Sequence, residues 1–294
     1  MKHKSAFINI IGNPNVGKSS LVNSFMGYKL SIITAKAQTT RHRIFCILNS
    51  KNFQFVFSDT PGLIEPKNKL HESMMNFVKS SYDDADIIIY VVDASSKEII
   101  NKNLKLKLKS LSIPVIIVIN KIDLINNEKL HLLIEEIKND FTDSLIFPIS
   151  VKENFNVKTV LENLKNLSPI SPPYFPKDQI TDKPERFFVN EIIREKILKF
   201  YKKEIPYAVE VVTNSFKYSN KILKIDSTIY VERSTQKGIL IGHKGKSLTE
   251  IGKKSRIELE NFFNKKVFLE IRVKVSKNWK SSSSSLKRFG YDSN

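Results

Sequence analysis

Short apolar runs alternate with longer amphipathic stretches over the first 167 residues. Most of the runs are continuous blocks of Ile, Val and Phe, which is typical of parallel strands covered on both faces by helices. Helical stretches of about a dozen residues separate several of them. The pattern predicts a doubly wound α/β domain with a mainly parallel sheet and strands at 6–12, 53–59, 86–94, 114–121 and 145–150.

A proline-rich stretch at 168–184 interrupts this pattern and holds five of the 11 prolines. Proline fixes φ and removes a backbone donor, so we expect an irregular, semi-rigid linker there. The domains are therefore predicted at 1–167 and 185–294.

The second domain has a different pattern of apolar positions. It starts with a predicted helix at 185–201 and continues with an alternating hairpin at 208–233. Two helices broken by glycines follow at 236–264, and an alternating strand at 266–276 ends the pattern. This α-β-β-α-α-β order predicts a smaller α+β domain. The serine run 281–285 is of low complexity, and we expect it to be mobile.

Composition and charge narrow the functional classes. The 294 residues include one cysteine, Cys46, which excludes a disulfide framework and a multi-thiolate metal site and suits a reducing cytosol. The longest apolar run is six residues, far short of a membrane span. The net charge of +18 is divided into +6 for residues 1–170 and +12 for the shorter remainder. Codon bias would raise lysine everywhere, so the uneven distribution favours a polyanionic partner for the second half.

GNPNVGKS at 12–19 matches the phosphate-binding pattern G-x-x-x-x-G-K-[ST]. It follows a predicted strand and opens a predicted helix, which is the context that the motif needs and that a chance loop lacks. The glycines let backbone amides surround phosphate oxygens at a helix N-terminus. Lys18 is expected to neutralise the β- and γ-phosphates, and the Ser19 hydroxyl to bind Mg²⁺.

DTPG at 59–62 ends the strand that begins at Phe53. Ligands of such sheets bind at the carboxyl ends of the strands, so this tetrapeptide is expected at the phosphate crevice rather than in an unrelated turn. Asp59 is expected to hold Mg²⁺ through water. Gly62 is expected to offer its N–H to the γ-phosphate.

NKID at 120–123 ends another apolar strand and predicts the base. The Asp123 carboxylate can accept hydrogen bonds from N1–H and the 2-amino group of guanine, and adenine has neither donor. Asn120 is expected to meet the 6-oxo and N7 side, Lys121 to pack along the ring, and Ser150 to support the base from the next loop.

These motifs resemble those of translation-factor-related GTPases, and KAQTTRHRI at 36–44 is similar to the Era family. The resemblance implies a switch-loop threonine that binds Mg²⁺ when the γ-phosphate is present, with Thr40 preferred to Thr39. It implies GTP or GDP as the cofactor, with Lys18, Thr40, Asp59, Gly62 and Asn15 in the catalytic machinery. The implied nucleotide site comprises Gly12, Asn13, Pro14, Asn15, Val16, Gly17, Lys18, Ser19, Ser20, Asp59, Thr60, Pro61, Gly62, Leu63, Asn120, Lys121, Ile122, Asp123, Ser150 and Val151.

Two positions depart from common GTPase patterns. Leu63 stands where Ras-like enzymes have a glutamine that orients water, and leucine has no hydrogen-bonding group. We therefore expect slow intrinsic turnover, or K⁺ recruited through Asn15 as in similar GTPases; Asn15 alternatively only shapes its loop. Val151 replaces the usual alanine after Ser150, a change that a backbone contact tolerates.

Gly242-His243-Lys244-Gly245 separates the two predicted helices of the second domain. A G-x-x-G turn lets a sugar–phosphate backbone approach closely, although it also occurs as a simple helix-ending glycine. Flanking lysines and a predicted apolar floor favour RNA binding. That floor is Ile239, Leu240, Ile241 and Ile251.

The second domain also resembles the type II KH domain of the Era family, in which the turn usually reads Gly-Lys-Gly-Gly. The implied partner is the 3′ end of small-subunit (16S) rRNA during 30S assembly, bound by a cytoplasmic monomer. Peripheral membrane contact is known among similar proteins. The alternatives are a static RNA-binding assembly factor and a P-loop kinase of small metabolites. Expected RNA contacts are Lys237, Ile239, Ile241, Gly242, His243, Lys244, Gly245 and Lys246.

Overall fold

The computed structural model describes residues 2–96 and 102–291 and divides into two compact units. The first comprises Met1–Ser31, Thr40–Glu65 and Met74–Asp182, and the second comprises Ile32–Thr39, Pro66–Ser73 and Lys183–Asn294. Among the described residues, no helix combines the length and apolar character needed to cross a bilayer.

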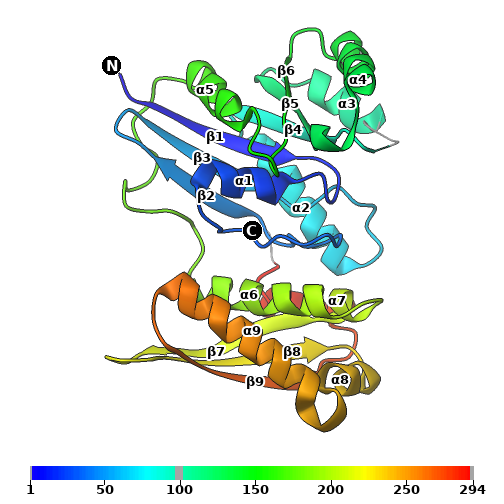
Figure 1. The fold of residues 1–294 in the computed structure, drawn as a ribbon, viewed down its shortest axis with the longest axis vertical. Helices are drawn as coiled ribbons and strands as arrows, with labels where there is room; N and C mark the ends of the chain where they lie inside the picture. Colours follow the sequence, from blue (N-terminus) through cyan, green and yellow to red (C-terminus); the bar gives the residue numbers. More distant parts are fainter. Residues whose placement is uncertain (1, 97–101, 292–294) are drawn as a thin grey trace. The chain divides into compact units, whose positions relative to one another are not determined.

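The first unit is built on a six-stranded sheet in the order β2-β3-β1-β4-β5-β6 (Figure 1). Only β2 runs antiparallel to its neighbour. The predicted doubly wound, mainly parallel sheet is therefore confirmed, while β2 itself was missed because it directly follows a polar loop. The strands are β1 (Lys4–Ile11), β2 (Ile44–Asn49), β3 (Phe53–Asp59), β4 (Ile87–Asp93), β5 (Val115–Asn120) and β6 (Leu145–Pro148).

Helices cover both faces of this sheet because its central strands are apolar on both sides. Alternate β4 residues Ile88, Tyr90 and Val92 pack with side chains of α3 and α4, while Ile87, Ile89 and Val91 are equally buried on the opposite face. The helices are α1 (Lys18–Met26), α2 (Lys69–Asp83), α3 (Lys102–Lys109), η1 (Ile122–Leu124), α4 (Asn127–Asp140) and α5 (Val157–Leu167).

The proline-rich stretch forms no helix or extended strand, but it is hydrogen-bonded to the edge of the first unit. The Ile47 N–H donates to the Ile180 carbonyl at 2.9 Å, and the Phe45 N–H donates to Asp182 Oδ1 at 2.8 Å. These contacts cover the free edge of β2, where unpaired backbone groups would otherwise face solvent. The sequence-based domain limits stay a prediction.

The second unit has a three-stranded sheet in the order β7-β8-β9, with β7 and β8 antiparallel and β8 and β9 parallel. Helices α6 and α9 pack against this sheet (Figure 1). The predicted α-β-β-α-α-β order is confirmed, with one short helix added before the hairpin. The elements are α6 (Glu185–Phe200), α7 (Ile205–Ala208), β7 (Glu210–Tyr218), β8 (Leu223–Val231), α8 (Ser234–Ile241), η2 (His243–Gly245), α9 (Lys246–Phe263) and β9 (Val267–Val275).

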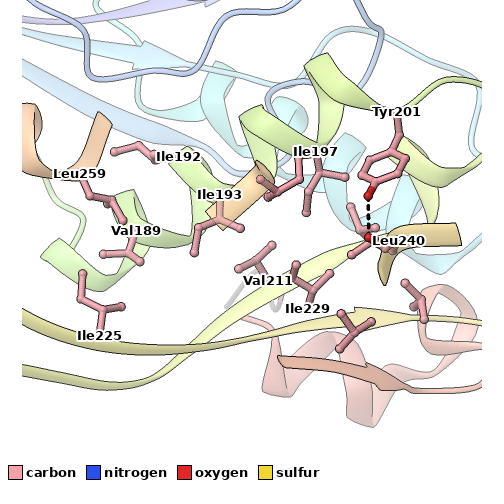
Figure 2. Close-up of a cluster of buried hydrophobic side chains, with 14 of the residues drawn as sticks. Val189, Ile192, Ile193, Ile197, Tyr201, Val211, Ile225, Ile229, Leu240 and Leu259 are labelled. Carbon is pink, nitrogen blue, oxygen red and sulfur yellow. Dashed lines mark hydrogen bonds between the residues drawn. The ribbon is translucent and has the colours of Figure 1, made fainter. Parts of the chain in front are cut away.

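The core of the second unit lies between α6, α9 and the sheet (Figure 2). Val189, Ile193 and Ile197 recur along one face of α6 and are fully buried against Val211 and Ile229 of the sheet. Apolar residues recur every three to four positions along α6 and every second position along the strands, and these two sets of side chains pack together in one layer.

The serine run does not match its prediction as a mobile low-complexity segment. Residues from Ser283 onward form α10 (Ser283–Arg288), and the Ser282 side chain accepts a hydrogen bond from the Ser285 N–H. Serine is a favourable N-cap, so the run starts a helix rather than remaining irregular. Before it, η3 (Trp279–Ser281) buries Trp279, whose indole N–H donates to the Ala208 carbonyl at 3.0 Å.

Candidate functional site

The 12–19 loop joins β1 to α1 and depends on two glycines in the left-handed half of φ space. A Cβ on Gly12, at φ +150°, would lie 2.3 Å from the Val91 carbonyl oxygen. A Cβ on Gly17, at φ +101°, would lie 2.2 Å from Asn120 Nδ2. Only glycine fits either position, so the loop is lined by backbone groups. It leads directly into the N-terminus of α1.

Lys18 is buried at the base of this loop, with 6% of its surface exposed. Its ammonium donates to the carbonyls of Gly12 at 3.0 Å and Asn13 at 2.9 Å. Burial lowers the pKa of Lys18 to about 8, an effect that the nearby Asp59 carboxylate partly opposes. The cation is therefore held inside the loop that the sequence assigns to phosphate.

The 59–62 loop is packed against the first loop. Asp59 is fully buried at the end of β3, and the Thr60 hydroxyl donates to the Ile10 carbonyl at 2.7 Å. A Cβ on Gly62 would lie 2.8 Å from the backbone of Pro14, and the Leu63 N–H donates to the Gly12 carbonyl at 3.2 Å. The predicted convergence of the two motifs is thus present.

The hydroxyls of Ser19 and Thr40 lie 2.8 Å apart. The Thr39 hydroxyl instead donates to the Lys36 carbonyl at 2.6 Å. The geometry therefore favours Thr40 over Thr39 as the partner of Ser19. Two hydroxyls together with the Asp59 carboxylate are hard oxygen donors of the kind that Mg²⁺ prefers, so these residues fit that ion.

Asn120 joins the phosphate loop to the base-binding loops. Its Nδ2 donates to the Val16 carbonyl at 2.8 Å, and its Oδ1 accepts from the Val151 N–H at 3.1 Å. Asp123 Oδ1 accepts from the Ser150 hydroxyl at 2.7 Å, and 16% of the Asp123 side chain is exposed. The carboxylate that would select guanine is thus oriented by a neighbouring hydroxyl.

Asp93, the last residue of β4, was not among the residues predicted from the sequence. Its Oδ2 accepts from Lys121 Nζ at 2.6 Å, and its Oδ1 accepts from Ser95. Burial tends to raise the pKa of Asp93, but these hydrogen bonds hold it below its ordinary value. The ion pair fixes Lys121, whose backbone has φ +64°. The sequence signal that could have identified Asp93 is a carboxylate directly after an apolar run, in the tetrapeptide Asp-Ala-Ser-Ser at 93–96.

The other predicted nucleotide contacts lie on these loops or in the first turns of the helices α1 and η1 that follow them. Asn15 is exposed at the tip of the first loop with φ +64°. The remaining ones are Asn13, Pro14, Ser20, Pro61 and Ile122.

The GHKG turn lies between the C-terminus of α8 and the N-terminus of α9. Gly242 and Gly245 have φ of +72° and +76°, and Lys244 between them has φ +48°. His243 and Lys244 are exposed, as is Lys246, the first residue of α9. The backbone thus adopts a conformation open to close approach, with lysines at its rim.

The predicted apolar floor beside this turn is partly wrong. Ile239 is 50% exposed and Ile241 is half-buried, but Leu240 and Ile251 are fully buried in the core of the unit. Their side chains stabilise the fold and are closed to a ligand. Lys237 is half-buried one turn before Ile241.

Two family models match the chain. A 50S ribosome-binding GTPase model matches residues 7–121, and a KH domain model matches residues 204–280. A crystal structure of Era in complex with MgGDPNP and nucleotides 1506–1542 of 16S ribosomal RNA is 38% identical, with a TM-score of 0.94. It covers 99% of this chain and 100% of its own. The chain belongs to the Era family.

A second Era structure agrees with this assignment. A single-residue variant of Aquifex aeolicus Era bound to GDP and AlF₄⁻ is 37% identical, with a TM-score of 0.93 over 99% of this chain and all of that one. The two units of this Era-family chain are therefore a P-loop GTPase domain and a KH domain, as the motifs predicted.

Proposed function

We propose that this chain is a GTP-hydrolysing switch that binds the 3′ end of small-subunit rRNA and assists assembly of the 30S subunit. The observation that carries the proposal is the convergence of three loops in the first unit. Gly62 lies against Pro14, Asn120 ties Val16 to Val151, and Ser150 orients Asp123. The same chain also contains the GHKG turn, which would bind the RNA that the nucleotide switch controls.

Guanine selection rests on Asp123. Its carboxylate would accept from N1–H and the 2-amino group of the base, while Ser150 keeps the side chain in place. Lys121, held by Asp93, would cover the ring. Because a buried acceptor without a donor costs about 1–3 kcal/mol, this arrangement disfavours adenine.

Hydrolysis requires neutralisation of the triphosphate and a positioned water. Ser19, Thr40 and Asp59 would hold Mg²⁺, which supplies charge neutralisation for the β- and γ-phosphates. Lys18 would place its ammonium on the same oxygens, and the Gly62 N–H would bind the γ-phosphate. Leu63 offers no group to orient water, which supports slow intrinsic turnover.

Thr40→Ala is expected to slow GTP hydrolysis on the order of 100-fold, since one group that stabilises the transition state is lost. GDP affinity is expected to change little, because the switch-loop threonine acts when the γ-phosphate is present. Single-turnover phosphate release measures the effect. Thr39→Ala is the matched control, and a larger loss in Thr39→Ala than in Thr40→Ala would reverse the assignment.

GDP binding at pH 8 is expected to take up about half a proton, because the pKa of Lys18 is about 8 before its ammonium meets phosphate. The phosphates raise that pKa, so the bound form is fully protonated. Calorimetry in buffers of different ionisation enthalpy measures the uptake. Lys18→Arg should abolish it, since arginine stays protonated; equal uptake by both proteins would rule out Lys18 as its source.

K⁺ is a further proposed cofactor, with Asn15 as its protein ligand. The exposed position of Asn15 at the loop tip, with φ +64°, supports this role. We expect faster hydrolysis in KCl than in NaCl of equal ionic strength, with the difference lost in Asn15→Ala. A difference that persists in Asn15→Ala would contradict the assignment.

RNA binding is assigned to the GHKG turn and its neighbours Lys237, Ile239, Ile241 and Lys246. The two glycines allow close approach of the sugar–phosphate backbone, and the lysines add salt-dependent affinity. Half-exposed Ile239 offers an apolar surface for a base.

Crosslinking the full chain to total RNA with GTP or GDP bound, followed by sequencing of the crosslinked sites, tests the function. Enrichment of the 3′ end of small-subunit rRNA is expected. Crosslinks spread over all RNA would contradict the assignment. A cytoplasmic, monomeric state and peripheral contact with the cell membrane belong to the same proposal.

A further inference from the structure

The end of α8, which leads into the GHKG turn, has a carbonyl that the helix itself leaves without a partner. A helix leaves its last four carbonyls without backbone donors from the next turn. The helix ends at Ile241, and the Gly242 N–H returns to the Gly238 carbonyl at 2.9 Å. The Leu240 carbonyl lies inside this last turn, and the Leu240 side chain is fully buried.

Tyr201 supplies the donor for this carbonyl. It follows α6 as its C-cap residue, is 7% exposed, and donates from its hydroxyl to the Leu240 carbonyl at 2.6 Å (Figure 2). The hydrogen bond joins residues 39 positions apart in the chain. The end of α6 is thus tied to the end of α8 two residues before the turn.

On the far side of the turn, Ser247 packs against Gly242. The Ser247 side chain lies so close to Gly242 that a Cβ there would be 2.2 Å from Ser247 Oγ. Ser247 belongs to the first turn of α9. The helix after the turn is therefore in close contact with Gly242, the residue that directly follows α8.

The turn needs such restraint because it contains a strained residue. Lys244 has φ +48° and ψ +32°, a left-handed conformation that is unfavourable for a non-glycine residue. Strained residues persist where their surroundings over-determine them. The Tyr201–Leu240 hydrogen bond holds the end of α8, and Ser247 of α9 packs against Gly242, so both flanks of His243–Gly245 are restrained around Lys244.

We propose that the Tyr201 hydroxyl is a positioning group for RNA recognition, which presets the GHKG turn in the conformation that accepts a sugar–phosphate backbone. Tyr201 itself contacts no RNA. Preformed turns bind more tightly because the ordering cost is met before the ligand arrives. The inference rests on the proposed RNA-binding role of the turn.

Tyr201→Phe removes the hydroxyl and keeps the ring. We expect the affinity of the full chain for a synthetic 3′-end fragment of small-subunit rRNA to fall about fivefold to tenfold, with GDP affinity unchanged. The slope of log K against log[salt] should stay as in the unaltered chain, because no phosphate contact is removed. Lys244→Ala should reduce that slope by about 0.7, the value for one contact to single-stranded nucleic acid.

Two controls separate positioning from general destabilisation. Tyr218→Phe removes a hydroxyl that donates to exposed Glu185 in the same unit, and its RNA affinity should be normal. Ile197→Val shortens a fully buried core side chain without touching the turn, and it should lower the melting temperature by about 5 °C with little loss of RNA affinity.

Normal RNA affinity in Tyr201→Phe, or an equal loss in Ile197→Val, would overturn the positioning role while leaving the proposed function intact. Failure of the unaltered chain to bind the fragment, or normal binding by Gly245→Asp, would overturn the RNA-binding role of the turn and the inference with it.

Discussion

Asp123→Asn is expected to turn the chain from guanosine nucleotides towards xanthosine nucleotides. The carboxylate would accept two hydrogen bonds from guanine, and charge-assisted bonds contribute about 1.5–3 kcal/mol each. Their loss should weaken GTP binding on the order of 100-fold or more. Xanthine carries an oxygen in place of the 2-amino group, so the asparagine amide can donate to it. The Ser150 hydroxyl can still donate to the retained side-chain oxygen.

Equilibrium binding of GDP and xanthosine diphosphate to both proteins measures this switch. Lys152→Ala is the matched control, because Lys152 lies 3.9 Å from Asp123 Oδ2 but its side chain is 76% exposed. Its effect on either nucleotide should stay within about twofold, as for an exposed ion pair. Unchanged GDP affinity in Asp123→Asn without a gain for xanthosine diphosphate would refute the base assignment.

Gly245→Asp is expected to weaken RNA binding about 10-fold to 100-fold and leave GTP affinity intact. A Cβ at Gly245 would meet no atom within 4 Å, so an aspartate fits there without a clash. The only destabilising effect is the backbone strain of a non-glycine residue at φ +76°. The aspartate carboxylate would face the RNA backbone where close approach and positive charge are needed. Gly242→Asp should also weaken RNA binding, but its Cβ would collide with Ser247 and destabilise the fold as well.

Gly27→Asp is the matched control for strain and charge. Gly27 has φ +75°, and a Cβ there also meets nothing within 4 Å, but it ends α1 in the GTPase domain. Its melting temperature should fall about as far as that of Gly245→Asp, with RNA affinity unchanged. Equal loss of RNA binding in both variants would assign the effect to strain or charge instead of the turn.

The parallel sheet and the three nucleotide loops could be predicted because they depend on local patterns. Continuous apolar runs such as Ile87–Val92 indicate buried strands, and the spacing of glycines and lysine in GNPNVGKS indicates a phosphate-binding loop. The turn at Gly242–Gly245 is equally local. Each signal lies within a few residues of the structure that it predicts.

Features that depend on distant residues were missed or misjudged. The edge contacts of β2 join Ile47 to Ile180, and Tyr201 meets a carbonyl 39 residues away, which no local pattern reveals. Leu240 and Ile251 belong to the same apolar pattern as Ile239, but only the packing of α8 and α9 decides which face is buried. The Ser281–Ser285 run was judged by composition, whereas the capping geometry of Ser282 determines its helix.

Multiple-turnover phosphate release by the full chain, with and without the 3′-end rRNA fragment, shows whether the protein is a guanine-nucleotide switch coupled to RNA. We expect repeated hydrolysis of GTP, little hydrolysis of ATP, and a rate of GTP hydrolysis that changes when the fragment is bound. Release that stops after one phosphate per protein molecule, or equal rates with ATP, would contradict a guanine-nucleotide switch and favour a static RNA-binding factor.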